Sequence, residues 1–322
     1  MNWKDIREQA LHGLRGLLNP TLIPMLNVRR CSAQDALVIS GYPRSGTTWL
    51  AEVIASVPGS AILFEPLNLQ AVPGAREAGF DWDNFHLPGE EWPAGERFME
   101  AVLSGKVLNR WTTGYIPLGQ TAHIERWIVK FVRANQMLGW ITQKFSLRAP
   151  VFIVRHPCAV FSSWSERGWP MLPRAQRNPA FLRAYPQLEA VMDRLETPEE
   201  FFAAKWCMEN YAPLALPKPR GFHVVAYEQL RTAPREELEP IFADWNLEIP
   251  AGIEDLIRRP SAKASAAFLG QGGAESGGWS RRLKPAQIDA ILAVVAAFGL
   301  DFYDGSPVPD MARLAAFDGR TP

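Results

Sequence analysis

The chain has 322 residues, of which 47% are hydrophobic, and it carries 34 basic and 34 acidic side chains. This length suits one large α/β domain or two small ones, and the balanced charge excludes an overall attraction to nucleic acid, so any cationic site must be local. The separated residues Cys31, Cys158 and Cys207 form no metal-ligand or disulfide pattern, and no apolar run reaches about 18 residues, so a cytoplasmic protein without a membrane span is expected.

Residues 1–34 are predicted to form a helical extension. Its early charges, among them Lys4 and Arg7, replace the apolar core of an export signal. The helix either packs on the domain, which is the simpler interpretation, or makes a peripheral contact with the inner face of a membrane. The apolar residues that repeat at helical spacing are Trp3, Ile6, Ala10, Leu14, Leu17 and Leu18.

The rest of the chain alternates short apolar segments with amphipathic ones, which predicts a single α/β domain with a central parallel sheet flanked by helices. An insertion at 66–127 and a Gly-rich loop at 260–283 interrupt the pattern. The expected strands are 35–40, 61–64, 128–132, 151–155 and 222–226. The expected helices are 45–57, 96–104, a segment between 132 and 151, one after residue 156, two within 178–214 with Thr197 capping the second, 234–245, 252–258 and 285–298.

The sequence GYPRSGTTW, residues 41–49, joins the first predicted strand to the first helix. Gly41 and Gly46 permit a tight turn, so the backbone N–H groups of the loop can point at one oxyanion where the helix begins. A Walker A loop has the same glycine spacing but places a lysine where this chain has Thr47, and the nearest cation here is Arg44. The loop therefore predicts an anion site and argues against nucleoside triphosphate hydrolysis, while a purely structural turn is the alternative.

A second motif, VFIVRHPCAVFSSW, begins with the fourth predicted strand. Arg155 ends that strand at the edge where open α/β sheets bind ligands, and its guanidinium can grip a phosphate with two hydrogen bonds. Ser163 lies eight residues later in the following helix and can add a hydroxyl group. Alone this arginine has the alternative of a surface cation, and with the first loop it predicts a two-phosphate site.

Together the two motifs resemble those of the sulfotransferases that use 3′-phosphoadenosine 5′-phosphosulfate (PAPS). In that family a Y-P-[KR]-S-G-T-T-W loop holds the 5′-phosphosulfate, and an arginine followed eight residues later by a serine holds the 3′-phosphate. The resemblance runs from about residue 37 to 300 and implies a P-loop-like fold, PAPS as co-substrate and 3′,5′-adenosine bisphosphate (PAP) as product. It assigns Arg44, Ser45, Gly46, Thr47 and Thr48 to the phosphosulfate loop, Trp49 to the adenine, and Arg155 and Ser163 to the 3′-phosphate.

The resemblance also implies a lysine beside the bridging oxygen of the donor, and Lys130 suits that role. A surface lysine is the alternative, although a cation within WIVKFV needs a partner. The loop 260–283 resembles the segment that closes over the donor but lacks the Arg-Lys-Gly triplet of many members. By resemblance we expect Gly278, Trp279 and Arg282 to contact the donor, with Arg281 an equal candidate, and Tyr227 to touch adenine or to belong to the core.

Transfer of a sulfuryl group requires a base near the sulfur. Glu65, which ends the second predicted strand in the sequence FEP, is similar to the glutamate of carbohydrate sulfotransferases and is the favoured base. His86, in the sequence HLP, is similar to the histidine of cytosolic phenol and steroid sulfotransferases, but the lysine two residues earlier is replaced by Asn84. His86 is therefore the alternative base or a residue of the acceptor pocket.

The resemblance implies a hydroxyl acceptor, and the Glu65 match favours a sugar of a glycolipid or oligosaccharide. A phenol, an alcohol or a peptidyl tyrosine stays open as the acceptor. No metal-ligand cluster occurs in the sequence, and cationic side chains and amides suffice for a sulfuryl group, so no metal is expected. The alternatives of another class are a P-loop kinase and an inactive nucleotide-binding module, and the oligomeric state is left open.

Overall fold

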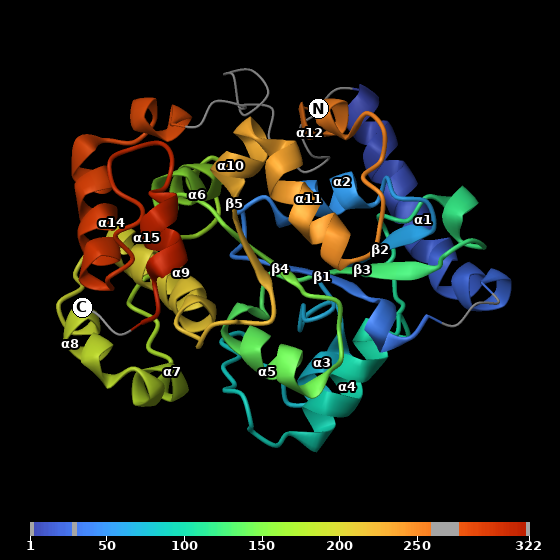
Figure 1. Cartoon of the computed structure of the whole chain (residues 1–322), viewed down its shortest axis with the longest axis horizontal. Coiled ribbons are helices and arrows are strands. Elements are labelled where there is room, and N and C mark those ends of the chain that lie inside the picture. Colours follow the sequence, from blue (N-terminus) through green and yellow to red (C-terminus); the bar gives the residue numbers. More distant parts are fainter. Residues whose placement is uncertain (1–2, 28–30, 259–276, 320–322) are drawn as a thin grey trace.

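The computed structural model describes residues 3–27, 31–258 and 277–319, and its five strands form one parallel sheet (Figure 1). Their order is β2-β3-β1-β4-β5. The strands are β1 (Leu37–Ser40), β2 (Ser60–Phe64), β3 (Arg126–Lys130), β4 (Val151–Val154) and β5 (His223–Ala226). Each lies within two residues of its predicted bounds, and the predicted α/β fold class is confirmed.

Successive strand residues face opposite layers of helices, as the two-residue period of a strand requires. Ile39 and Ile128 pack under the layer that contains α2 (Thr47–Ile54) and α11 (Pro234–Asp244), whereas Val38 and Val129 face the layer that contains α4 (Pro93–Leu103) and α5 (Leu138–Lys144). A third core beside β4 joins α6 (Pro157–Ser165), α9 (Pro198–Leu214) and α14 (Pro285–Ala297). Because both faces are covered, the strands are almost wholly apolar, which is why short apolar runs predicted them.

Most predicted helices are present, and Thr197 caps α9 as expected, since its Oγ1 accepts a hydrogen bond from the N–H of Glu200 at 3.3 Å. The chain also forms α3, α10 and α15, which were not predicted, and the first of the two helices expected within 178–214 is divided into α7, η4 and α8. The α-helices are α1 (Trp3–Leu26), α2 (Thr47–Ile54), α3 (Pro73–Glu77), α4 (Pro93–Leu103), α5 (Leu138–Lys144), α6 (Pro157–Ser165), α7 (Pro179–Ala184), α8 (Glu189–Met192), α9 (Pro198–Leu214), α10 (Tyr227–Thr232), α11 (Pro234–Asp244), α12 (Ile253–Arg258), α14 (Pro285–Ala297) and α15 (Met311–Ala316). Short 3₁₀ helices are η1 (Ala33–Asp35), η2 (Leu118–Gln120), η3 (Asn135–Met137), η4 (Pro186–Leu188) and η5 (Gly278–Arg281).

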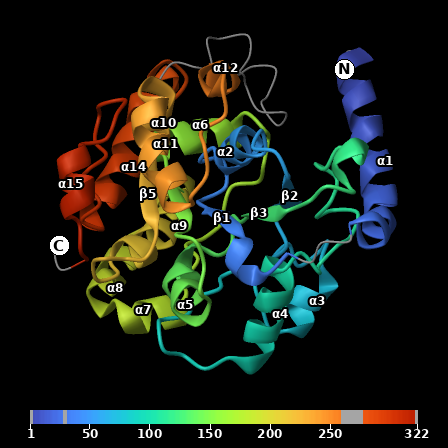
Figure 2. The ribbon, with the colours of Figure 1, turned by 45° about the vertical axis from the view of Figure 1, so that its right-hand side comes forward.

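Helix α1 stands at the β2 edge of the molecule (Figure 2) and continues through Pro20 and Pro24. It is held to the insertion by Asn19, whose Nδ2 donates to the carbonyl oxygens of Thr113 at 2.9 Å and Ile116 at 2.8 Å. None of the helices within the described ranges is long and apolar enough to cross a membrane. Of the predicted Gly-rich loop, residues 260–276 lie outside the described residues, and η5 follows them.

Candidate active site

The candidate site lies at the carboxyl ends of β1, β4, β2 and β3. Because the central strand β1 pairs with β3 on one side and β4 on the other, the loops that leave these strands meet at one edge of the sheet. Loop 41–46 leaves β1, Arg155 follows β4, and Glu65 follows β2. The structure therefore places loop 41–46, Arg155 and Glu65, one of the two candidate bases, at the same edge of the sheet.

Loop 41–46 is folded tightly against β4 and α10. A Cβ atom at Gly41 would lie 2.5 Å from the Ile153 carbonyl oxygen, and one at Gly46, whose φ is 96°, would lie 2.5 Å from the ring of Tyr227. Only glycine fits these positions without a shift. The Oγ atom of Ser45 is buried and has no hydrogen-bond partner in the part of the chain that is described. Thr47 and Thr48 then begin α2, whose first N–H groups have no partner within the helix.

Arginine side chains gather beside this loop. Arg155 Nη1 donates to the carbonyl oxygen of Arg44 at 2.8 Å, and Arg44 Nε donates to Ser163 Oγ at 2.9 Å. Burial and the nearby guanidinium groups of Arg167 and Arg155 lower the pKa of Arg44 to about 10. The buried Nε of Arg155 has no hydrogen-bond partner among the described residues. A partly desolvated cluster of cations with unused donors suits a multiply charged anion.

Aromatic rings surround the arginines. The Arg155 guanidinium lies 4.2 Å from the ring centre of Tyr227, and the Tyr227 ring meets that of Trp49 edge to face at 5.5 Å. Trp49 is buried, and Arg231, which the sequence analysis did not select, lies 5.4 Å from its ring centre. A planar base could be held at the edge of this group.

The described end of the Gly-rich segment packs on the start of α6. Trp279 stacks on His156 with ring centres 4.4 Å apart, and Arg282 forms a 3.1 Å ion pair with Glu166 in the turn after Ser163. Gly278 begins η5, and Arg281 ends it. This segment therefore lies beside the Arg155–Ser163 half of the site.

The second half of the site is a cluster of charged side chains at the end of β2 and β3. Lys130 Nζ lies 2.5 Å from Glu65 Oε1, and Arg133 Nη1 lies 3.8 Å from Glu65 Oε2. The Lys130 side chain is 2% exposed and that of Glu65 is 16% exposed. Lys130 is therefore a buried lysine, not the surface lysine of the alternative interpretation. Its ammonium group has the charged partner that a buried cation needs.

Two residues of this site adopt a backbone conformation that is unusual for side chains with a Cβ atom. Arg44 has a φ of 73° and Glu65 a φ of 42°, and among the described non-glycine residues only Asn246 shares a positive φ. Such conformations cost about 1–3 kcal/mol each and cluster where side chains must be aimed at a ligand. Glu65 is held by Trp111, whose Nε1 donates to the Glu65 carbonyl oxygen at 3.3 Å.

His86 lies in another environment. Its Nδ1 is 3.0 Å from Glu90 Oε2, and its ring stacks on Trp92 with centres 4.3 Å apart. It borders a small hollow against Gln136 and Leu216, away from the lining of the larger pocket described next.

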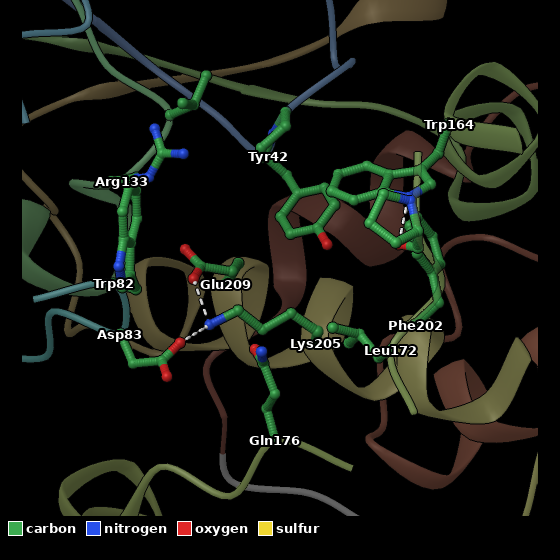
Figure 3. Close-up of a pocket in the computed structure, with 13 residues that line it drawn as sticks. Tyr42, Trp82, Asp83, Arg133, Trp164, Leu172, Gln176, Phe202, Lys205 and Glu209 are labelled. Atoms are coloured by element: carbon green, nitrogen blue, oxygen red, sulfur yellow. Dashed lines mark hydrogen bonds and ion pairs between the residues drawn. The ribbon is translucent and has the colours of Figure 1, made fainter. Parts of the chain in front are cut away.

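A pocket of about 260 Å³ opens between loop 41–46 and α9. Figure 3 shows Lys205 reaching between Asp83 and Glu209 on one side of the pocket, with Tyr42, Trp164 and Phe202 on another and Arg133 over Trp82 on a third. The Arg133 guanidinium is 4.6 Å from the ring centre of Trp82. Because Arg133 also pairs with Glu65, the pocket borders the second half of the site.

Lys205 and Glu209 are functional candidates that sequence reasoning missed. Lys205 pairs with Asp83 and lies 3.1 Å from Glu209 Oε1; burial lowers the pKa of Lys205, but the two carboxylates raise it on balance. Glu209 in turn accepts hydrogen bonds from Asn135 at 3.0 Å and Gln136 at 2.9 Å. The sequence carried one signal for them, the i, i+4 spacing of a lysine and a glutamate on a helix that is otherwise mostly apolar.

Arg133 was also missed, although it stands three residues after Lys130 in the same IVKFVR segment.

No group of three or more His, Cys, Asp or Glu side chains within the described ranges could hold a metal ion.

Residues 36–251 match a family model described as the sulfotransferase family. Among solved structures, the chain is similar to mouse sulfotransferase SULT7A1 complexed with PAP, at 15% identity over 95% of this chain and 96% of that chain, with a TM-score of 0.45. It is similar to the sulfotransferase domain from the curacin biosynthetic pathway, at 15% identity over 85% of this chain and 99% of that domain, with a TM-score of 0.41. Sulfotransferase STF1 from Mycobacterium tuberculosis is matched at 13% identity over 89% of this chain and 81% of that one, with a TM-score of 0.38. The curated proteins contain no match to the sequence.

Proposed function

Because the chain belongs to the sulfotransferase family, we propose that it transfers a sulfuryl group from PAPS to a hydroxyl group of an acceptor bound in the pocket beside Lys205. Because the chain belongs to this family, it is a sulfotransferase. The two alternatives, a P-loop kinase and an inactive nucleotide-binding module, are therefore not pursued. The observation that carries the rest is the convergence of loop 41–46, Arg155 and the Glu65–Lys130 pair at one edge of the sheet.

The donor half suits a nucleotide with phosphate groups at both ends of its ribose. Residues 44–48 would hold the 5′-phosphosulfate with backbone N–H groups and the Ser45 hydroxyl, which lacks a partner in the described chain. Arg155 and Ser163 would hold the 3′-phosphate, since the Arg155 Nε is buried without a partner and its Nη1 already fixes the loop. Trp49 and Tyr227 would hold the adenine.

The closing segment would complete the donor site. Trp279 would contact the nucleotide from η5, and Gly278 would let the backbone approach it. Arg282 is supported as the ligand of the 3′-phosphate by its 3.1 Å pair with Glu166, which holds it beside α6. Arg281 remains the alternative.

PAPS supplies an activated sulfuryl group whose S–O bond to the 5′-phosphate breaks as the acceptor oxygen attacks sulfur. Glu65 would take the proton of the acceptor hydroxyl during that attack. Lys130 and Arg44 would stabilise the negative charge that develops on the departing phosphate oxygen, together with the N–H groups at the start of α2. Arg133 would hold the second carboxylate oxygen of Glu65 and so aim the base.

Glu65 is supported over His86 as the base by its place in the molecule. The carboxylate sits on Lys130 and Arg133, and Arg133 lines the pocket that also touches Tyr42 of the donor loop. His86 is engaged by Glu90 and Trp92. A phenol or alcohol acceptor with His86 as base is the second candidate mechanism.

The pocket lining favours a sugar acceptor. The Trp82 and Trp164 rings offer faces that stack on a sugar ring, and Lys205 and Glu209 offer a donor and an acceptor for its other hydroxyl groups. The aromatic walls also suit a phenol, but His86, the base of the second mechanism, lies outside the lining of this pocket.

The experiment is a measurement of PAP released from PAPS, without magnesium, in the presence of glycolipids, oligosaccharides and phenols in turn. We expect turnover with members of one sugar class, and a rise in the acceptor KM in Lys205→Met without loss of PAP affinity. Transfer to phenols alone would move the proposal to the second mechanism. The proposal would be contradicted if no acceptor class raised the rate of PAP release above that of background PAPS hydrolysis.

A further inference from the structure

Glu228 is a buried carboxylate that the proposed reaction does not use. It lies in α10 immediately after Tyr227 and is 3% exposed. Its Oε1 accepts a hydrogen bond from the N–H of His156 at 3.0 Å, and its Oε2 accepts one from the Tyr303 hydroxyl at 2.8 Å. Both donors are uncharged, whereas a buried carboxylate needs a compensating positive charge. That charge therefore comes from a neighbour outside these two hydrogen bonds.

The neighbour is Arg155. The parallel pairing of β4 and β5 places Val154 opposite Ala226, so Arg155 and Glu228 leave the sheet side by side. Burial raises the pKa of Glu228, and its hydrogen bond to a backbone N–H and the charge of Arg155 lower it in part. The Arg155 guanidinium lies over the ring of Tyr227, the residue before Glu228, at 4.2 Å from the ring centre. The carboxylate and the guanidinium are thus close enough to attract each other.

The donors of Arg155 are nevertheless not used by this carboxylate. Arg155 Nη1 donates to the Arg44 carbonyl oxygen at 2.8 Å, and the buried Nε has no hydrogen-bond partner among the described residues. A carboxylate turned toward Arg155 would form a bidentate ion pair and occupy such donors. The Oε2 atom of Glu228 is held by the Tyr303 hydroxyl instead. Burial and the Glu228 carboxylate raise the pKa of Tyr303 well above its usual value, so the hydroxyl keeps its proton and remains a donor.

The same carboxylate is linked to the closing side of the donor site. The His156 ring, next to the N–H that Glu228 accepts, stacks on Trp279 with ring centres 4.4 Å apart. Tyr303 meets the His156 ring edge to face at 5.0 Å. Glu228 therefore joins the end of β4, the start of α10 and the contacts of η5.

We propose that Glu228, held by Tyr303, is a positioning residue for the 3′-phosphate of the donor. It fixes the peptide between Arg155 and His156 without pairing with the guanidinium, which stays available to the phosphate. This role rests on the proposed function, in which Arg155 would bind the 3′-phosphate.

The test compares the Kd values of PAP and 5′-AMP by titration calorimetry on the full-length protein. In Tyr303→Phe the carboxylate loses the donor that holds Oε2 and turns toward Arg155, so the preference for PAP should fall about tenfold, the scale of one charged hydrogen bond. Glu228→Gln should keep the wild-type preference, because the amide oxygen still accepts the His156 N–H and an amide forms no ion pair with Arg155. The double variant Tyr303→Phe, Glu228→Gln should regain the preference that Tyr303→Phe loses.

Two further variants make the test specific. Glu228→Asp leaves Tyr303 unchanged, but its shorter side chain cannot reach both donors and should likewise lower the preference for PAP. Tyr211→Phe is the matched control, since it also removes a buried hydroxyl, which donates to the Gly319 carbonyl oxygen at 2.9 Å, and it lies on α9 outside the donor site described above. It should keep the wild-type preference. The unfolding temperature without nucleotide shows that each variant is folded.

The role of Glu228 is refuted if Tyr303→Phe and Glu228→Asp keep the wild-type preference for PAP. It is also refuted if the double variant stays as weak as Tyr303→Phe, or if Tyr211→Phe loses the preference equally, because the loss would then follow from general destabilisation. A wild type that binds PAP no better than 5′-AMP would refute the donor assignment itself, so the two failures are distinguished.

Discussion

Lys130 Nζ and Glu65 Oε1 lie 2.5 Å apart at the ends of two adjacent parallel strands. The register of the sheet makes this contact, because Phe64 is paired with Lys130 and the N–H of Glu65 then donates to the Lys130 carbonyl oxygen at 2.9 Å. The two charged groups are 65 residues apart in sequence and meet at the edge of the sheet where loop 41–46 leaves β1. The proposed base and the proposed stabiliser of the leaving group are thus held by one pair of strands.

Glu65→Gln should lower turnover by about 100-fold or more, since an amide keeps the hydrogen bond to Lys130 but cannot accept the proton. Affinity for PAP should change little. The measurement is PAP release under saturating PAPS, with the acceptor that the screen above identifies. His86→Asn is the matched control, and a large loss there with full activity in Glu65→Gln would transfer the role of base to His86.

Arg155→Ala should weaken PAP much more than 5′-AMP, because it removes charged hydrogen bonds to the 3′-phosphate. Such bonds contribute about 1.5–3 kcal/mol, which corresponds to roughly 10–100-fold in Kd. Titration calorimetry with both nucleotides checks the ratio. Arg313→Ala, which removes a surface arginine paired with Asp301, should leave both affinities unchanged. Equal weakening of PAP and 5′-AMP by Arg155→Ala would place the 3′-phosphate elsewhere.

Gly46→Ala should destabilise the fold and abolish PAP binding, because it combines a strained φ of 96° with a Cβ atom 2.5 Å from the Tyr227 ring. Gly89→Ala separates the two effects, since Gly89 has a φ of 91° and nothing within 4 Å of its Cβ position. The strain alone costs about 1–2 kcal/mol, so Gly46→Ala should lose more stability than Gly89→Ala in urea unfolding. Equal losses would mean that the loop does not pack on Tyr227.

His156 should make the fold sensitive to acid. Burial lowers the pKa of His156 to about 4, and its ring packs between Trp279 and the Asp304 carbonyl oxygen. An unfolded histidine takes up a proton below pH of about 6.5, whereas the folded one stays neutral until about 4, so the unfolded state binds more protons in this window. The free energy of unfolding should therefore fall as the pH drops from about 6.5 to 4, by up to roughly 3 kcal/mol from this group.

The check for His156 is the difference between the wild type and His156→Asn in urea unfolding at several pH values. Asparagine retains a side-chain acceptor for the Cys158 N–H at the start of α6, so the helix cap is preserved. The variant should lose less stability on acidification than the wild type. If the free energy of unfolding fell equally with pH in the wild type and in His156→Asn, protonation of the folded His156 would carry no free-energy cost, which would contradict the prediction.

The sheet and the tight turn of loop 41–46 could be predicted because both depend on short, local stretches of sequence. Buried parallel strands are short apolar runs, and loop 41–46 needs its glycines for contacts within a strand–turn–helix unit. Helix α1 lies within the predicted helical extension 1–34 and ends at Leu26. It continues through Pro20 and Pro24, which normally break helices, and packing through Asn19 holds this part of the chain in place. Helices α3, α10 and α15 have five or six residues, too few for a hydrophobic period to be visible.

The pocket beside Lys205 could not be predicted because its parts come from distant segments. Asp83, Arg133 and Lys205 meet only after the insertion, β3 and α9 have packed together. The partners of Glu209 are likewise 73 and 74 residues away. Periodicity identifies which face of a helix is buried, but it does not identify what that face meets.

The most direct test of the central claim is a thermal-shift comparison of the purified protein with PAP, 5′-AMP and ATP with magnesium. A ligand at about 100 times its Kd raises the free energy of unfolding by roughly 2.7 kcal/mol, which is readily measured. We predict that PAP stabilises the protein far more than either of the other two nucleotides, because Arg155 and Ser163 distinguish the 3′-phosphate. Stronger stabilisation by ATP with magnesium, or none by PAP, would contradict the assignment of the donor site.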